Sequence, residues 1–178
     1  MKKVAFFALI VLCLLMATTG FTCDESNGQI VYAPASYNVI PGTGGSFVVT
    51  RLIIRNISQD SSITLTGLDL YSPEGIFVRD LLGQDEPYEI EPVLDPLSSV
   101  TILLSPALYG SELPLYNYGD EPDKRPCFIV KWKSHKKVCA PMIYSIGITF
   151  GAGGVTSETR TPSTVIGELG KHDNKNKH

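Results

Sequence analysis

Histidine and tryptophan are scarce in this chain. Its 178 residues include three histidines, one tryptophan and four cysteines. His172 and His178 stand in a polar C-terminal segment, which leaves His135 as the remaining candidate for a base or a metal ligand. A histidine-based zinc site needs more ligands than this, and nucleophilic catalysis needs a base beside the nucleophile. His135 lies between a serine and two lysines, so we interpret it as a hydrophilic turn residue.

The chain has fewer basic residues (15 Lys and Arg) than acidic residues (18 Asp and Glu). The formal net charge is −3, and loss of Lys2 and Lys3 with an N-terminal signal would change it to −5. Such a surface offers no electrostatic footprint for nucleic acid, and we expect no nucleic-acid partner. The one basic cluster is interpreted as solvated positions on a strand and its turn; it consists of Lys131, Lys133, Lys136 and Lys137.

No segment has a sustained helical period. Proline, glycine, serine and asparagine recur between short apolar runs, which is typical of an all-β protein. We therefore predict an immunoglobulin-like antiparallel β-sandwich of about seven to nine strands, in a domain over residues 29–170. The expected strands are residues 29–33, 47–56, 62–71, 76–82, 98–104, 128–133, 142–150, 155–159 and 163–166.

Two-residue alternation indicates which side chains face the core. In residues 128–133, Phe128, Val130 and Trp132 are expected to point inward. In residues 47–56 the set expected inside is Val48, Thr50, Leu52 and Ile54. In residues 62–71, strict alternation sets Ile63, Leu65, Gly67 and Asp69 opposite Thr64, Thr66, Leu68 and Leu70. Ser72-Pro73-Glu74-Gly75 predicts a turn that joins residues 68–71 to 76–82 in a hairpin, because Gly75 tolerates a positive φ.

The N-terminus resembles a bacterial export signal. Lys2 and Lys3 precede an apolar run from Val4 to Met16, followed by small and weakly polar residues. We expect a signal peptide over residues 1–22, a short tether over 23–28, a disordered tail over 171–178, and a location in the periplasm or cell envelope. Retention of the signal as a membrane anchor is the alternative, although its apolar run falls short of the roughly twenty residues of a spanning helix.

The sequence is consistent with two ways of cleaving the signal peptide. An ordinary signal peptidase would cut near Thr19 or Gly20. Alternatively, Cys23 is the lipid-modified first residue of a lipoprotein, which would anchor the protein in the membrane. Phe21 and Thr22 depart from the lipoprotein pattern, but lipidation of Cys23 would account for an odd number of cysteines in the exported chain.

Cys127 and Cys139 are candidates for a disulfide. Export favours the bridge. An extended strand from Cys127 to His135 opposes it, because the two Cα atoms would then lie beyond the roughly 7 Å limit for bridging. The bridge thus requires an early reversal near Lys133 or Ser134. Pairing of Cys23 with either cysteine is a third option.

The long segment from 105 to 126 contains Tyr109, Tyr116 and Tyr118. Tyrosines on a loop above a rigid sandwich provide amphipathic contact area for a sugar or a protein. Alternatively, these rings fold back and cap one end of the core.

Carboxylates are the remaining candidates for chemistry. They lie at strand ends or in residues 83–97, where surface solvation explains them, although a glycosidase pair is an alternative; the set is Asp69, Asp80, Asp85, Glu86, Glu89, Glu91 and Asp95. Asp120, Glu121 and Asp123 are an alternative calcium cluster, although they lack the spacing of an EF-hand loop. We expect no catalytic residues, no metal and no cofactor. Asn56-Ile57-Ser58 matches a glycosylation acceptor but is interpreted as a turn.

Several strand motifs resemble those of the bacterial domain of unknown function 3124 family. The similarity rests on residues 52–56, 68–79, 128–132 and 141–148, and on Thr156, Ser157 and Arg160 near the close of the domain. Cys127, Cys139 and the lysine-rich segment between them depart from the family pattern. The resemblance implies an exported β-sandwich but implies no activity and no catalytic residues.

These observations predict a non-enzymatic exported or lipid-anchored domain that binds a protein or an envelope component. One alternative is a carbohydrate-binding module that uses the loop tyrosines. The other is an envelope hydrolase that depends on carboxylates.

Overall fold

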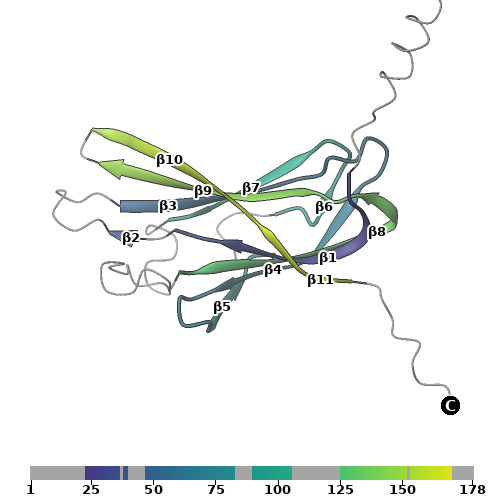
Figure 1. Ribbon diagram of the computed structural model, residues 1–178, viewed down its shortest axis with the longest axis horizontal. Coiled ribbons are helices and arrows are strands. Elements are labelled where there is room, and N and C mark those ends of the chain that lie inside the picture. Colours follow the sequence, from purple (N-terminus) through teal and green to yellow (C-terminus); the bar gives the residue numbers. More distant parts are fainter. Residues whose placement is uncertain are drawn as a thin grey trace, which may run out of the picture.

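The computed structural model describes residues 23–36, 38–39, 47–82, 90–105, 125–151 and 153–169, which form an all-β domain of two antiparallel sheets packed face to face (Figure 1). The predicted β-sandwich is confirmed at this level. Within the described residues, no helix has the length and apolarity needed to cross a bilayer. The expected signal peptide and C-terminal tail lie outside these residues.

The six-stranded sheet has the order β11-β1-β8-β4-β5, with β6 paired to β4; the five-stranded sheet has the order β10-β9-β3-β2, with β7 paired to β3. The strands are β1 (Glu25–Pro34), β2 (Asn38–Val39), β3 (Phe47–Arg55), β4 (Ile63–Tyr71), β5 (Phe77–Asp80), β6 (Val93–Leu94), β7 (Ser99–Leu104), β8 (Cys127–Cys139), β9 (Met142–Gly151), β10 (Gly154–Pro162) and β11 (Thr164–Glu168). The chain from β10 to β11 passes from one sheet to the other (Figure 1).

The core between the sheets is built from the alternating positions that the sequence indicates. Phe128, Val130 and Trp132 of β8 are fully buried, as are Leu52 and Ile54 of β3. Removing each of these side chains from water contributes roughly 1.5–3 kcal/mol. The predicted inward set of β8 is confirmed, and on β3 the buried residues include the expected Thr50 but also Val49.

A β-bulge in β4 changes the predicted alternation. Leu65 pairs with Trp132, but Gly67 rather than Thr66 pairs with Lys131. Two residues of β4 therefore oppose one residue of β8, and the side chains that follow change face. As a result Ile63, Leu65, Leu68 and Leu70 are all buried in the core, whereas strict alternation divides them between the two faces.

The predicted hairpin is present between β4 and β5. Gly75 has a φ of 78°, and its N–H donates to the Ser72 carbonyl at 2.9 Å. The Ser72 N–H donates in turn to the Ile76 carbonyl at 2.9 Å. Glycine carries the positive φ without the steric cost that a Cβ would impose.

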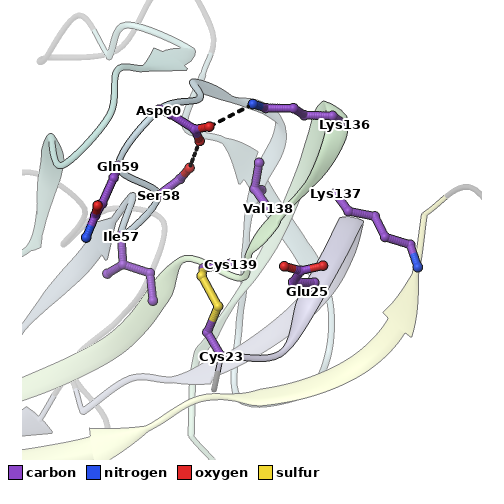
Figure 2. A pocket seen from close by; sticks show the side chains of 10 residues that line it. All are labelled: Cys23, Glu25, Ile57, Ser58, Gln59, Asp60, Lys136, Lys137, Val138 and Cys139. Atoms are coloured by element: carbon purple, nitrogen blue, oxygen red, sulfur yellow. Dashed lines mark hydrogen bonds and ion pairs between the residues drawn. A yellow bond between two sulfur atoms is a disulfide. The ribbon is translucent and has the colours of Figure 1, made fainter. Parts of the chain in front are cut away.

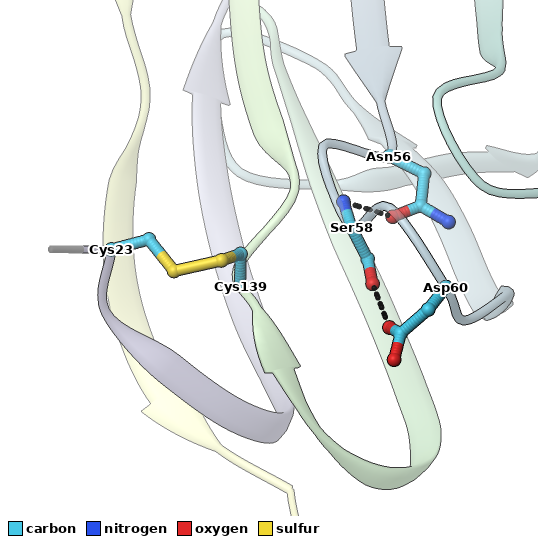
Figure 3. The surroundings of a disulfide bond; sticks show 5 residues. All are labelled: Cys23, Asn56, Ser58, Asp60 and Cys139. Atoms are coloured by element: carbon cyan, nitrogen blue, oxygen red, sulfur yellow. Dashed lines mark hydrogen bonds between the residues drawn. A yellow bond between two sulfur atoms is a disulfide. The ribbon is translucent and has the colours of Figure 1, made fainter. Parts of the chain in front are cut away.

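Residues 23–28 are part of the fold and not the tether that we expected. β1 begins at Glu25, which pairs with Cys139, and Gly28 pairs with Lys133. Between these pairs β1 has few residues and β8 has several more, including the basic segment 134–137. The two strands therefore curve together, with β1 on the shorter path, as Figure 3 shows beneath Cys23 and Cys139. The basic segment belongs to a long bent strand and not to a turn between strands.

Candidate functional site: the outer face of the six-stranded sheet

The outer face of the six-stranded sheet carries an unusual number of apolar side chains. Cross-strand pairing fixes which residues share it, because the partners of a pair project from the same side of the sheet. Tyr32 pairs with Ile129, Pro34 with Cys127, and Tyr71 with both Cys127 and Phe77. The core residues Val31, Ala33, Phe128 and Val130 occupy the alternate positions. Antiparallel sheets in sandwiches commonly present polar residues to water, so this face differs from the common pattern.

The apolar residues on this face are mostly half-buried. Tyr32, Tyr71, Cys127 and Ile129 are half-buried, and Phe77 at the edge is 53% exposed. The rings of Tyr71 and Phe77 meet edge to face, with centroids 5.8 Å apart and an interplanar angle of 75°. Burial is also the main cause that raises the pKa of Tyr32 above its ordinary value. Cross-strand pairing therefore joins the aromatic residues into one continuous surface, in which Ile129 and Cys127 lie between Tyr32 and the Tyr71–Phe77 pair.

An ion pair lies at the centre of the face. Lys131 Nζ donates to Asp69 Oδ2 at 2.7 Å. This hydrogen bond is the main cause that raises the pKa of Lys131. A Cβ at Gly67 would lie 2.9 Å from Lys131 Cδ, so the lysine stem passes over the glycine on its way to the carboxylate. The pair itself is neutral, and Asp80, the cross-strand partner of Asp69, adds a negative charge beside it.

Cys127 carries a free thiol on this face. It is half-buried, and burial raises the pKa of its thiol. The structure pairs Cys139 with Cys23 instead, with Cα atoms 5.4 Å apart (Figure 3). The predicted Cys127–Cys139 bridge is therefore wrong. The early reversal near Lys133 that it requires does not occur, and the whole length of β8 separates the two cysteines.

The disulfide also bears on the lipid attachment expected at Cys23. A sulfur atom in a disulfide has no bond free for a thioether to diacylglycerol. The two states of Cys23 exclude each other in one molecule, so lipidation at Cys23 does not fit this structure.

The disulfide borders a hollow of about 600 Å³ between the bent end of β8 and the loop after β3 (Figure 2). Lys136 and Asp60 both line this hollow and form an ion pair of 2.9 Å. The hydrogen bond from Lys136 is the main cause that lowers the pKa of Asp60. Glu25 and Lys137 also line the hollow, so its charges are mixed and select no particular ligand.

Asn56 organises the loop beside the hollow. It is fully buried, and its Nδ2 donates to the carbonyls of Ser61 at 2.8 Å and Leu94 at 3.0 Å. Its Oδ1 accepts from the Ser58 N–H at 3.0 Å (Figure 3). Asn56 is therefore a structural residue of a turn, as the sequence indicates, and its amide is inaccessible to glycosylation in the folded domain.

The structure does not assemble a catalytic constellation from the candidates that it describes. Asp69 and Asp80 are a cross-strand pair, but they lie on the open sheet face and Lys131 occupies the carboxylate of Asp69. His135 is exposed on β8. No group of metal-ligating side chains comes together within the described part of the chain. Tyr109, Tyr116 and Tyr118 lie outside the described residues, as do Asp85, Glu86, Glu89, Asp120, Glu121 and Asp123.

Comparison of the chain with protein families, curated proteins and solved structures finds no match. The site therefore rests on geometry alone. Sequence reasoning missed this face because it treated the outward residues of each strand singly. The available signal was that Tyr32 and Ile129, both large and apolar, alternate with core residues on their own strands.

Proposed function

We propose that this chain is an exported, non-enzymatic domain that binds a protein component of the cell envelope through the outer face of its six-stranded sheet. The observation that carries this proposal is the continuous aromatic and aliphatic surface of Tyr32, Tyr71, Phe77, Cys127 and Ile129. Interface cores in proteins are enriched in tyrosine and phenylalanine and depleted in charge. The neutral Lys131–Asp69 pair beside these residues adds a hydrogen-bonding element for specificity.

Two further features support export and the finer architecture. A disulfide persists in an oxidising compartment, which agrees with the N-terminal signal pattern. An immunoglobulin-like arrangement is supported by two face-to-face antiparallel sheets and by a fully buried tryptophan, Trp132, on a central strand. The disulfide differs from that arrangement because it lies at one end of β1 and β8 and not across the core. Membership of the bacterial domain of unknown function 3124 family is a proposal that rests on the strand motifs.

The alternatives find less support. A sugar-stacking platform needs flat exposed rings, and the Tyr71–Phe77 pair is edge to face. A glycosidase needs two free carboxylates across a cleft, whereas Asp69 is bound by Lys131 on an open face. Carbohydrate binding through Tyr109, Tyr116 and Tyr118 stays a prediction.

The proposal is tested by site-specific photo-crosslinking in the exporting cell. A photoreactive phenylalanine analogue at position 77 is expected to give a discrete protein adduct, because this edge-strand side chain projects from the face. The same analogue at Val155, which is 56% exposed on the other sheet, is the matched control. Adding Tyr32→Asp should abolish the adduct. No adduct at position 77, or adducts of equal yield at both positions, would reject this face as the binding site.

A further inference from the structure

The outer face of the five-stranded sheet is basic, although the protein as a whole is acidic. Thr50, Leu52 and Ile54 of β3 are buried in the core, so the alternate residues Arg51 and Arg55 project outward. Arg51 pairs with Ile146 of β9, and Ile146 pairs with Arg160 of β10. All three arginines are exposed and face the same way. We call this surface, with the residues between them, the arginine face.

The three arginines are spread over the face of the sheet. Arg51 and Arg55 are four positions apart on one strand, about 13 Å, and Arg51 and Arg160 are two strands apart, about 10 Å. No ion pair found among the described residues involves any of the three. Glu158 of β10, which is paired with Ile148, is the acidic side chain that the described strands contribute to this face. The face therefore keeps a net positive charge.

Apolar side chains fill the spaces between the arginines. Ile53 pairs with Tyr144, and Arg55 pairs with Met142, which is 49% exposed. The Arg160 guanidinium lies 4.6 Å from the centre of the Tyr144 ring, so its stem and charge extend across an aromatic surface. A surface that mixes arginine, tyrosine and aliphatic side chains is suited to the boundary between lipid headgroups and acyl chains.

Cys23 and its disulfide lie near one end of this face. Cys23 is bonded to Cys139, which lies three residues before Met142 at the start of β9. Cys23 also lines the same hollow as Ile57 and Ser58, so it lies near the end of β3 that carries Arg55.

We propose that the arginine face docks the domain onto an anionic lipid surface. Three positive charges complement the phosphate headgroups, and the aliphatic and aromatic side chains enter the interface between them. This orientation leaves the outer face of the six-stranded sheet directed away from the bilayer. The proposal concerns the opposite sheet from the proposed function, so each can fail without the other.

Vesicle co-sedimentation tests the proposal with the oxidised chain from Cys23 onward, because the apolar run from Val4 to Met16 would itself enter vesicles. Binding is expected to vesicles that contain phosphatidylglycerol in phosphatidylcholine and not to phosphatidylcholine alone. It should weaken strongly with added salt, because the screening length falls from about 10 Å at 0.1 M to about 3 Å at 1 M. The double variant Arg51→Gln/Arg55→Gln is expected to lose about tenfold or more in the vesicle partition coefficient. Lys133→Gln, on the other sheet, is the control and should bind as the wild type does.

Several outcomes would overturn the proposal. Equal binding to both kinds of vesicle, salt-insensitive binding, or full binding by the double variant would each do so. Inorganic phosphate at matched ionic strength should compete no better than chloride; full competition would indicate a site for a small anion and not a lipid surface. Retention of poly-glutamate without vesicle binding would indicate an acidic protein partner. If the double variant fails to fold, the salt and lipid dependence of the wild type still decides.

Discussion

Lys131 and Asp69 form an ion pair of 2.7 Å between β8 and β4, on the solvent side of the six-stranded sheet. The side chain of Asp69 is 12% exposed and that of Lys131 is 37% exposed. The ion pair with the lysine therefore offsets most of the cost of removing the carboxylate from water. Removing only the lysine leaves a largely buried negative charge, which is costly. Removing both groups also removes the cost of the unpaired buried charge.

This asymmetry predicts the outcome of a double-mutant cycle with Asp69→Asn and Lys131→Met. The expected coupling in the free energy of unfolding is about 1 kcal/mol at neutral pH, after allowance for solvent screening of the half-exposed lysine. The measurement is urea unfolding of the four proteins. A coupling near zero would show that the pair contributes nothing to stability.

The same pair has a defined pH dependence. The pKa of Lys131 is raised in the folded state, chiefly by the hydrogen bond to Asp69. Its stabilising effect is therefore fully present below the unfolded lysine pKa of about 10.4 and is lost as the pH rises through the folded value. Above the folded pKa of Lys131, the coupling from the double-mutant cycle should disappear. The stability of the Lys131→Met variant should lack this contribution to its pH dependence. A coupling that persists there contradicts the assignment.

Gly28→Ala is expected to destabilise the domain by roughly 1–3 kcal/mol, as overpacked positions commonly do. A Cβ at Gly28 would lie 2.6 Å from the Trp132 carbonyl oxygen, a backbone atom that cannot move aside alone. The clash falls where β1 and β8 begin to curve together. Thermal unfolding measures the effect. Gly153→Ala is the control, since nothing lies within 4 Å of a Cβ there; an equal loss in both variants would contradict the explanation.

Asn56→Ala should cost about 3 kcal/mol in the free energy of unfolding, because it leaves several buried backbone groups without partners. These groups are the carbonyls of Ser61 and Leu94 and the Ser58 N–H. Asn56→Asp keeps the shape but loses the Nδ2 donor, and it should be destabilised as well. Asn27→Ala, an exposed position on β1, should change stability little. Chemical denaturation of the three variants gives the answer, and a mild effect at Asn56 would show that water replaces its hydrogen bonds.

Local alternation was enough to predict the sandwich and much of its core. Phe128, Val130 and Trp132 lie on one regular stretch of strand, where the two-residue period alone decides burial. The same reasoning failed in β4 because the bulge at Thr66 and Gly67 depends on the register with Lys131, which lies far away in the sequence. Bulges are properties of a strand pair and leave little trace in one strand.

The cysteine pairing could not be predicted for a similar reason. The distance between Cys127 and Cys139 depends on whether β8 reverses, and sequence reasoning left that choice open. β8 instead continues as a bent strand paired with β1, and this pairing brings Cys23 to Cys139 across the sequence. The binding surface also depended on register, since Tyr32, Ile129 and Tyr71 become neighbours only when β1, β8 and β4 are aligned.

The thiol of Cys127 provides a last prediction, because its pKa is raised by burial in the outer face of the six-stranded sheet. A thiol kept neutral by desolvation reacts slowly, since the thiolate is the nucleophile. Iodoacetamide should therefore modify the Cys127 peptide more slowly in the folded protein than in urea, with a pH midpoint above the usual value of about 8.5. The raised pKa also means that stability is retained below the unfolded thiol pKa and falls as the pH rises through the folded one. Peptide mapping without reductant should find Cys23 linked to Cys139 in the same sample. A Cys127–Cys139 peptide would contradict the pairing, and alkylation of Cys127 as fast as in urea would contradict the burial of its thiol.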